Sequence, residues 1–318
     1  MTIAVIGCGE VGILYTGALH TCSEKFYLCD PNPSPRALLL AERTGAILSQ
    51  CAGEWLRNAD IVISCVVGSI SLEVASKALP YMHKGAMFAD MTTCNPVEIR
   101  KAAGLAANIG IDYVDVAIMG IVALAGIKTP LLCAGPSAAK VCAIFEKVGA
   151  PVRIVANGAA GDASTLKIIR SIFAKGLEAL AIETLMAAEK VGVTEELYEV
   201  LTDIDENSLR STLESFVKTH LIHAPRRLRE IQEAERLLNE AGLPVAVLPG
   251  VRTLFERTCR YLKQDFVQEM PATAQVALDW LAMNAKRELQ EERDEVLRTA
   301  EAVHLTASSG LLNKIGHS

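Results

Sequence analysis

Lys167 is the residue of this sequence whose type and surroundings best suit catalytic chemistry. It stands shortly after the loop 158–161 and near the start of a long, proline-free helical pattern over 161–193. A lysine amine exchanges protons near neutral pH when burial or a neighbouring cation lowers its pKa. The plain alternative is a lysine on a helix surface. The position of Lys167, between a glycine-containing loop and an apolar helix, makes it a candidate for proton transfer, and both interpretations stay open at this point.

A glycine-rich loop stands close to the start of the chain. The pattern G-x-G-x-x-G directly follows a predicted strand at 2–7 and opens a predicted helix. Its first glycine permits a tight turn, the second lets a pyrophosphate approach the backbone, and the third allows close helix–strand packing. The N–H groups at the helix N-terminus attract phosphates. The loop predicts a dinucleotide site made by Gly7, Gly9, Glu10, Val11 and Gly12, with the Glu10 carboxylate complementing the helix N-terminus.

Asp30 bears on the choice of dinucleotide. It ends the second predicted strand, 25–30. A carboxylate there accepts hydrogen bonds from the adenosine ribose hydroxyls and repels a 2′-phosphate. This favours NAD, while Arg36, six residues further on, leaves NADP possible.

The order of apolar segments predicts an α/β protein. Short apolar runs alternate with amphipathic segments before Asn157, which is typical of a doubly wound parallel sheet of the Rossmann type, and only helical patterns follow. The predicted domains are a dinucleotide-binding domain, 1–157, and an all-helical domain for substrate binding and dimerisation, 158–318, that begins with the long helix. Further strands are expected at 60–68, 85–93, 111–119, 129–135 and 152–156, with a short strand or turn at 45–50. Helices are expected near 37–44, 71–78 and 137–148, and later at 195–204, 206–219, 224–241, 248–264, 272–285 and 286–303.

Composition excludes several classes of function. The formal net charge of −6 argues against binding to nucleic acid or an anionic membrane, and we find no apolar run long enough to span a bilayer. None of the nine cysteines forms a C-x-x-C pair, and no His/Cys cluster has zinc spacing, so no metal site is expected. Several cysteines lie in apolar runs. They are interpreted as reduced thiols of a cytoplasmic protein that acts on a small molecule.

Beyond the dinucleotide fingerprint, the chain resembles the β-hydroxyacid dehydrogenases, which include 3-hydroxyisobutyrate dehydrogenase and 6-phosphogluconate dehydrogenase. Residues 90–96, DMTTCNP, are similar to the D-x-S-T-x-x-P turn that lies near nicotinamide and substrate in that family. Residues 158–167, GAAGDASTLK, match its G-x-x-G-x(5)-K segment, and Arg229-Glu230 resembles a Lys-Asp pair ahead of the turn at 241–245. The resemblance implies that Lys167 is the catalytic acid/base. It also implies a homodimer.

The chain also departs from the family pattern. Residues 115–121, DVAIMGI, correspond to D-A-P-V-S-G-G, so Met119 replaces the serine and Ile121 the last glycine. Two asparagines that usually follow the lysine are Arg170 and Ser171 here. These changes re-line the substrate pocket and indicate a less-characterised branch with a distinct helical C-terminal domain. The cofactor contacts predicted beyond the loop are Val66, Val67 and Thr92, and the predicted substrate-binding residues are Thr93, Asn95, Met119, Gly120, Arg170, Ser171, His223, Arg227 and Glu230.

Three functions remain open. The first is hydride transfer between a nicotinamide cofactor and a hydroxyacid-like alcohol or carbonyl compound, with Lys167 as general acid/base. The second is an imine reductase-like reduction of C=N bonds, although such enzymes often replace the lysine. The third is a dinucleotide-binding sensor without catalysis. The cluster of His223, Arg226 and Arg227 is interpreted either as an anion-binding group or as the basic start of a helix.

Overall fold

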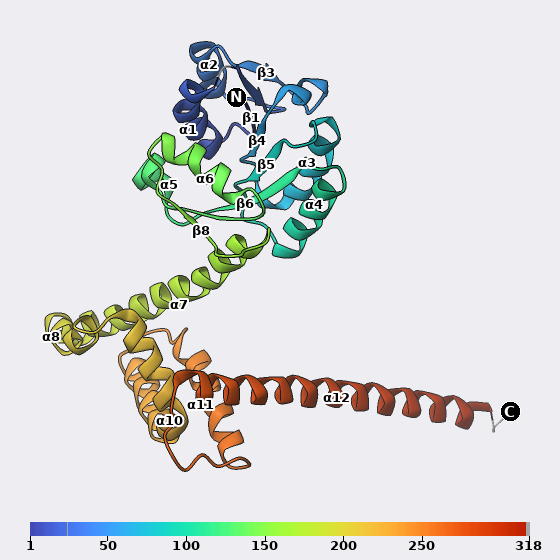
Figure 1. Cartoon of the computed structure of the whole chain (residues 1–318). Helices are drawn as coiled ribbons and strands as arrows, with labels where there is room; N and C mark the ends of the chain where they lie inside the picture. Colours follow the sequence, from blue (N-terminus) through green and yellow to red (C-terminus); the bar gives the residue numbers. More distant parts are fainter. Residues whose placement is uncertain (24, 316–318) are drawn as a thin grey trace. The chain divides into compact units, whose positions relative to one another are not determined.

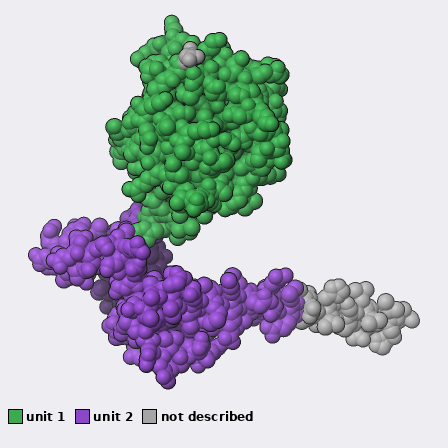
Figure 2. All heavy atoms as spheres, in the orientation of Figure 1, with its two compact units in different colours: residues 1–175 green, residues 176–318 purple. Residues whose placement is uncertain are grey.

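Helix α7 (Asp162–Val191) connects two compact units of the chain. The structure, a computed structural model, describes residues 1–23 and 25–315, with side chains up to residue 298. The first unit comprises Met1–Lys175 and the second Gly176–Ser318, so their boundary falls within α7 (Figure 2). Each unit has its own architecture.

The first unit contains an eight-stranded sheet in the order β3-β2-β1-β4-β5-β6-β7-β8 (Figure 1). The order from β3 to β6 is that of dinucleotide-binding folds, with a switch point between β1 and β4. The doubly wound fold predicted from the sequence is therefore confirmed. The strands are β1 (Thr2–Ile6), β2 (Lys25–Cys29), β3 (Ile47–Ser49), β4 (Ile61–Ser64), β5 (Met87–Asp90), β6 (Asp112–Ile118), β7 (Leu131–Ala134) and β8 (Val152–Ile154).

Helices cover both faces of this sheet, which explains why its central strands are almost continuously apolar. One core cluster joins the strands to α1 (Glu10–Leu19), α2 (Pro35–Thr44) and α6 (Ala138–Lys147). A second cluster joins them to α3 (Ser71–Ala78) and α4 (Pro96–Asn108). The remaining short helical segments are α5 (Val122–Ala125) and 3₁₀ turns at His20–Cys22, Glu54–Asn58, Gly68–Ile70, Leu79–Tyr81 and Gly126–Lys128.

Two details of the first unit differ from the sequence-based expectation. Strand β7 runs antiparallel to β6, so the sheet is not wholly parallel. A parallel pair needs a crossover, usually a helix packed on the sheet, and the connection 119–130 contains only short helical turns. Helix α4 was not expected. Its start has a readable signal, because Asn95 accepts a hydrogen bond from the Val97 N–H at 2.9 Å and is followed by proline at the first helical position.

The described part of the second unit is helical throughout. After α7 come α8 (Thr194–Val200), α9 (Thr202–Asp205), α10 (Leu209–Glu240), α11 (Leu248–Leu262) and α12 (Ala274–Ile315). The predicted break near 220–223 is wrong, since α10 continues through Pro225. An internal proline costs a helix about 3 kcal/mol. Burial of Leu221 and Ala224 next to it offsets that penalty. The predicted break at 285 is also wrong, because α12 is one helix (Figure 1).

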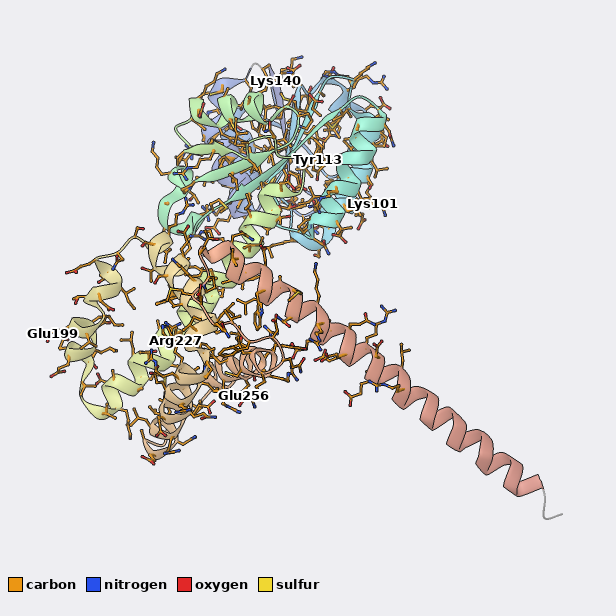
Figure 3. The ribbon with its side chains drawn as sticks, turned by 60° about the horizontal axis from the view of Figure 1, so that its bottom comes forward. Lys101, Tyr113, Lys140, Glu199, Arg227 and Glu256 are labelled. Atoms are coloured by element: carbon orange, nitrogen blue, oxygen red, sulfur yellow. The ribbon has the colours of Figure 1, made fainter. Side chains whose placement is uncertain are left out.

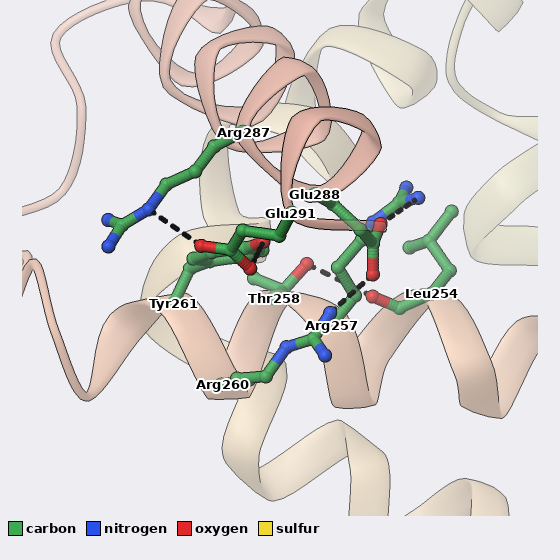
Figure 4. A network of polar contacts seen from close by, with 8 residues as sticks. All are labelled: Leu254, Arg257, Thr258, Arg260, Tyr261, Arg287, Glu288 and Glu291. Carbon is green, nitrogen blue, oxygen red and sulfur yellow. Dashed lines mark hydrogen bonds and ion pairs between the residues drawn. The ribbon is translucent and has the colours of Figure 1, made fainter. Parts of the chain in front are cut away.

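Polar contacts hold the helices of the second unit together. Glu183 on α7 accepts three backbone N–H groups at the start of α11, from Ala246, Val247 and Leu248. A second group of contacts links α11 to α12 (Figure 4): Arg257 and Arg260 pair with Glu288, and the Tyr261 hydroxyl donates to Glu291. Glu291 also pairs with Arg287 of its own helix. None of the described helices combines the length and apolarity needed to cross a membrane.

Candidate functional site

The glycine loop after β1 has the shape that a dinucleotide requires. Gly7 has a φ of +92°, and a Cβ there would lie 2.8 Å from the Cys65 carbonyl oxygen. A Cβ on Gly12 would lie 1.9 Å from the Gly7 carbonyl oxygen, so only glycine fits. At Gly9, by contrast, a Cβ would meet nothing within 4 Å. The loop is therefore tightly packed at Gly7 and Gly12, and it has open space at Gly9.

The N-terminus of α1 faces this open space without a side-chain cap. Gly9 is the N-cap residue, and among the described residues no side chain caps the start of the helix. The first N–H groups of a helix bind phosphate oxygens. Glu10 lies in the first turn and is exposed, where its charge complements the helix dipole. The backbone of Gly9, Glu10 and Val11 thus fits a pyrophosphate.

Asp30 directly follows β2 and supports the loop. Its carboxylate accepts hydrogen bonds from the Cys8 N–H at 2.7 Å and the Asn32 N–H at 2.9 Å. Val66, which is half-buried, and Val67, which is exposed, follow β4 on the other side of β1. All the cofactor-binding residues predicted from the sequence except Thr92, which follows β5 and is buried, therefore lie around the carboxyl ends of β1, β2 and β4, at the switch point of the sheet.

The turn that follows β5 is built on the buried carboxylate of Asp90. One oxygen accepts hydrogen bonds from the Thr92 N–H at 3.0 Å and the Thr92 hydroxyl at 2.7 Å. The other accepts from the Ser71 hydroxyl at 2.6 Å and the Tyr113 hydroxyl at 2.5 Å. Tyr113 reaches it from β6 within the sheet unit (Figure 3). Burial and the nearby Asp90 charge raise the pKa of Tyr113, which keeps its hydroxyl a donor. Thr92 thus points inward, while Thr93 is exposed.

Gly68 fixes the other side of this turn. A Cβ at Gly68 would lie 2.4 Å from the Thr93 carbonyl oxygen. No real side chain fits at that distance, so the loop after β4 contacts the Thr93 backbone directly. Asn95, the last predicted residue of the turn, is engaged in capping α4.

Lys167 meets Thr93 across 74 positions of sequence. Its Nζ donates a hydrogen bond to the Thr93 hydroxyl at 2.5 Å. The lysine is half-buried. Burial lowers its pKa from the ordinary lysine value, and the charge of Asp115 partly counteracts that effect. The site therefore holds an amine of reduced basicity beside a hydroxyl, at the carboxyl-end turn of β5.

Asp115 on β6 holds the start of α7. Its carboxylate, which has no exposed surface, accepts hydrogen bonds from the Gly161 N–H at 3.0 Å, the Ser164 N–H at 2.9 Å and the Ser164 hydroxyl at 2.7 Å. Burial raises the pKa of Asp115, and the donors from Ser164 and Gly161 lower it. The first turn of α7, and with it the position of Lys167, is thereby tied to the sheet.

Met119 and Arg170 lie on a different cavity from the Lys167–Thr93 contact. They line a cavity of about 810 Å³ together with Arg153 and Leu166. Gly120 precedes α5 and is exposed. The Ser171 hydroxyl donates to the Lys167 carbonyl oxygen at 2.9 Å, so it is engaged with its own helix. The residues predicted to bind substrate in the first unit therefore form two groups.

The three remaining predicted residues belong to the second unit. His223, Arg227 and Glu230 lie within α10, and so does Arg226, which corrects the expectation that the basic cluster precedes a helix. Arg226 pairs with Glu230 at 2.5 Å. Arg227 donates to the Thr219 hydroxyl at 3.0 Å.

Sequence reasoning missed the residues that position the turn and the helix. These residues are buried or partly buried, and each is a glycine or has a polar side chain. They lie in a strand, in the loop after a strand, or in the first turn of α3 or α7. A carboxylate inside an apolar run, as at Asp90 and Asp115, is the signal that points to them, because a buried charge requires several partners. The missed set is Gly68, Ser71, Asp90, Tyr113, Asp115 and Ser164.

Comparison with known proteins agrees with this architecture. Residues 2–158 match the family model described as the NAD binding domain of 6-phosphogluconate dehydrogenase, and residues 188–258 match a domain of unknown function, DUF1932. A curated relative from Methanothermus fervidus, "Uncharacterized 28.5 kDa protein in 7S RNA 5'region", is 30% identical over 256 residues. The match covers 80% of this chain and 98% of the relative.

Solved structures share the fold. One is a conserved protein of unknown function whose structure is described as similar to 3-hydroxyacid dehydrogenases. It is 27% identical, with a TM-score of 0.58, over 81% of this chain and 96% of its own. Another is an imine reductase variant from Myxococcus stipitatus in complex with NAD⁺. It is 18% identical, with a TM-score of 0.69, over 82% of this chain and 94% of its own.

The two family-model matches agree with the Gly7–Gly12 loop and with the strand order. The chain belongs to the 6-phosphogluconate dehydrogenase-like family, in a branch that joins the NAD-binding domain to a helical domain of the DUF1932 type.

Proposed function

We propose that this protein is a nicotinamide-dependent oxidoreductase that transfers hydride between NAD and a hydroxyacid-like alcohol or carbonyl substrate, with Lys167 as general acid/base. The observation that carries the proposal is the hydrogen bond from the Lys167 amine to the Thr93 hydroxyl. It joins the start of α7 to the turn after β5, close to the carboxyl ends of the strands where a dinucleotide binds.

In the proposed reaction Lys167 transfers the proton and Thr93 orients the lysine amine. NAD, when bound, supplies the hydride acceptor. In the oxidative direction the neutral Lys167 amine accepts the proton of the substrate hydroxyl as the carbinol hydrogen leaves as hydride. In the reductive direction the ammonium returns that proton to the carbonyl oxygen. Burial lowers the pKa of Lys167, which makes the neutral amine accessible nearer to neutral pH. The Thr93 hydroxyl orients the amine.

Asp30 supports NAD over NADP. Its carboxylate stands at the end of β2 beside the glycine loop, where a 2′-phosphate would meet a negative charge. Glu10 adds a second negative charge on the same loop. NADP remains the alternative because Arg36 lies in the first turn of α2.

The proposed substrate is a small acid that reacts at Lys167 and Thr93, and Arg170 is a proposed substrate-binding residue of a second cavity, separate from the Lys167–Thr93 contact. Arg170 lies three residues after Lys167 on α7 and lines the cavity that also contains Met119. An apolar methionine beside a guanidinium suits a substrate with both an apolar and an anionic part. The substrate roles of His223, Arg227 and Glu230 remain proposals of the same kind.

We also propose a cytoplasmic homodimer. The described cysteines are all free, which suits a reducing compartment. Helix α7 leaves Ile169, Ile172 and Leu177 more than half exposed, and a second copy of the chain would cover them.

The test is an absorbance screen at 340 nm over hydroxyacids, with NAD and NADP in parallel, on the wild type, Lys167→Ala and Lys101→Ala. Lys101 is an exposed lysine on α4 (Figure 3), so its replacement controls for loss of charge alone. We expect kcat to fall at least about 100-fold in Lys167→Ala, with cofactor affinity retained. Activity equal to the wild type in Lys167→Ala would refute the assignment.

The imine reductase-like alternative is favoured by the shared fold and by the apolar Met119 at the family's serine position. Adding cyclic imines and NADPH to the screen separates the two. Turnover of imines alone would replace the hydroxyacid proposal. Cofactor binding without turnover of any compound would favour the third alternative, a dinucleotide-binding sensor without catalysis.

A further inference from the structure

Two buried carboxylates occupy partner positions on neighbouring strands of the first unit. Asp90 on β5 and Asp115 on β6 are paired in the parallel register, and neither has any exposed surface. Asp90 holds the turn that carries Thr93, and Asp115 holds the helix start that carries Lys167. The Lys167–Thr93 contact is therefore built from two halves, each anchored on one carboxylate.

Burial of the Asp115 carboxylate at this position has a large desolvation cost. Transfer of an ionised carboxylate into a protein interior costs several kcal/mol unless hydrogen bonds and charges compensate. Among the described side chains, no ion pair involves Asp115. All three of its contacts are donors, two backbone N–H groups and a hydroxyl, so the carboxylate acts as an acceptor on both oxygens.

Capping alone does not account for a charged residue here. Ser, Thr or Asn caps a helix start with comparable hydrogen bonds and carries no charge to desolvate. A negative charge adds one thing that these residues lack, namely a field at the first turns of α7. Lys167 stands one turn beyond Ser164, within reach of that field.

We propose that Asp115 is a positioning residue that holds Lys167 against Thr93 and supplies the negative charge that keeps the amine able to exist as an ammonium. The proposal rests on the proposed function of Lys167 as general acid/base. In the reductive direction the ammonium is the proton donor, so Asp115 maintains the form of Lys167 that this direction requires.

Other charged groups near the start of α7 do not replace Asp115. They are Asp90 on β5, Arg100 on α4, and Asp162 and Arg170 on α7 itself. Arg100 pairs with Asp162 at 3.7 Å, which leaves little net charge from those two. Asp115 is the one charged group that raises the pKa of Lys167, against the lowering effect of burial.

The decisive measurement is the pKa of the Lys167 amine itself, obtained without any substrate. The rate of acetylation of Lys167 by acetic anhydride is followed from pH 6 to 11 by mass spectrometry of the purified full-length protein. Asp115→Asn keeps an oxygen acceptor for Gly161 and Ser164 but removes the charge. We expect the pKa of Lys167 to fall by about one unit, because an opposite charge has been lost.

Asp162→Asn is the matched control, since it makes the same chemical change at the start of the same helix. The pKa of Lys167 should stay at its wild-type value in this variant. If Asp115→Asn is folded and its Lys167 titrates as in the wild type, the proposal is overturned.

A reciprocal measurement covers the case in which Asp115→Asn does not fold. Loss of the lysine charge in Lys167→Met must raise the pKa of Asp115, because the coupling acts in both directions. A higher pKa for a buried carboxylate means that acid unfolding begins at a higher pH. The acid-unfolding midpoint of Lys167→Met should therefore exceed that of Lys101→Met, and equal midpoints would overturn the proposal.

Failure of this proposal and failure of the proposed function give different results. The acetylation titration involves no turnover, so it can succeed even if Lys167→Ala retains full activity. Conversely, loss of activity in Lys167→Ala would support the catalytic role of the lysine. If the pKa of Lys167 were unchanged in Asp115→Asn at the same time, only the role of Asp115 would be refuted.

Discussion

At the scale of single residues, the site depends on the pairing of an amine with a hydroxyl. The Lys167 amine has three rotatable donors and a long flexible stem, so it needs an acceptor to define its direction. Thr93 supplies that acceptor at 2.5 Å. Thr93 is exposed and has little packing of its own, but Asp90 and Gly68 fix the backbone on either side of it. The geometry of the pair therefore depends on Asp90 and Gly68, which position the backbone at Thr92 and Thr93.

Replacement of Thr93 tests this pairing. Thr93→Val removes the hydroxyl and keeps the branched shape, so kcat should fall about 10- to 100-fold, which corresponds to the roughly 1.5–3 kcal/mol of a hydrogen bond to a charged group. The pKa of Lys167 should move further below its ordinary value, since an acceptor of the ammonium is lost. The measurement is the pH dependence of kcat, whose acid limb should shift to lower pH.

Thr93→Ser is the control for that variant, because it restores the hydroxyl without the methyl group. It should retain kcat within about threefold of the wild type. Wild-type kcat and an unshifted profile in Thr93→Val would show that the contact has no catalytic role.

At the scale of elements, strand ends and helix starts set the geometry. In the first unit, the carboxyl ends of β1, β4 and β5 bring the glycine loop, Val66 and Thr93 to the same edge of the sheet. In the second unit, the start of α11 is held by a residue of α7, since Glu183 accepts hydrogen bonds from the N–H groups of Leu248 and of the two residues before it. One carboxylate thus fixes the junction between two helices.

Glu183→Gln should destabilise the second unit. A glutamine has one carbonyl oxygen in place of two carboxylate oxygens and loses the charge that favours a helix N-terminus, so we expect a loss of about 1–3 kcal/mol. Thermal unfolding followed by circular dichroism at pH 7 measures this. Glu189, on the same helix, accepts one long hydrogen bond of 3.3 Å from the Thr194 hydroxyl. The variant Glu189→Gln should therefore unfold at the wild-type temperature.

The effect of Glu183 should depend on pH in a definite sense. Burial raises the pKa of Glu183, but the three backbone N–H donors outweigh burial and leave the pKa below its ordinary value. A carboxylate with a depressed pKa stabilises the folded state above its unfolded pKa and loses that contribution as pH falls through the folded pKa. The difference between wild type and Glu183→Gln should therefore narrow below about pH 4.5. A constant difference down to pH 3 would contradict the role of the charge.

At the scale of the whole molecule, the apolar residues exposed along α7 are the surface that the proposed dimer would cover. Ile172 is 71% exposed and Ile169 56% exposed on this helix. Exposed apolar side chains that recur along one helix usually mark an interface. The homodimer that we propose would bury them between two copies.

Ile172→Glu should convert this dimer to a monomer. A charge in the centre of an apolar interface costs several kcal/mol to desolvate. Light scattering after size exclusion should give twice 34.1 kDa for the wild type and 34.1 kDa for the variant. Val97→Glu replaces a residue that is 67% exposed on α4 and should remain dimeric. A monomeric wild type, or a dimeric Ile172→Glu, would exclude this interface.

The sequence by itself determined the features that depend on local backbone geometry and on periodic burial. Gly7, Gly9 and Gly12 could be read as a dinucleotide loop because their G-x-G-x-x-G pattern directly follows a strand and opens a helix, which are both local signals. The bounds of α7 followed from the apolar repeat and the absence of proline, and the predicted range 161–193 is close to Asp162–Val191. Lys167 was identified from its place after the loop together with the resemblance to the β-hydroxyacid dehydrogenases, whose G-x-x-G-x(5)-K segment residues 158–167 match.

Only the tertiary structure decided features that depend on contacts between distant residues. The direction of β7, the continuity of α10 through Pro225, and the roles of Asp90 and Asp115 each result from packing against segments far away in the sequence. A carboxylate in an apolar run indicates burial, but the sequence does not say which donors will meet it. A proline ends a helix unless burial of its neighbours offsets the lost hydrogen bond. The partner of Lys167 is of this kind, because Thr93 reaches it only once β5 and α7 are in place.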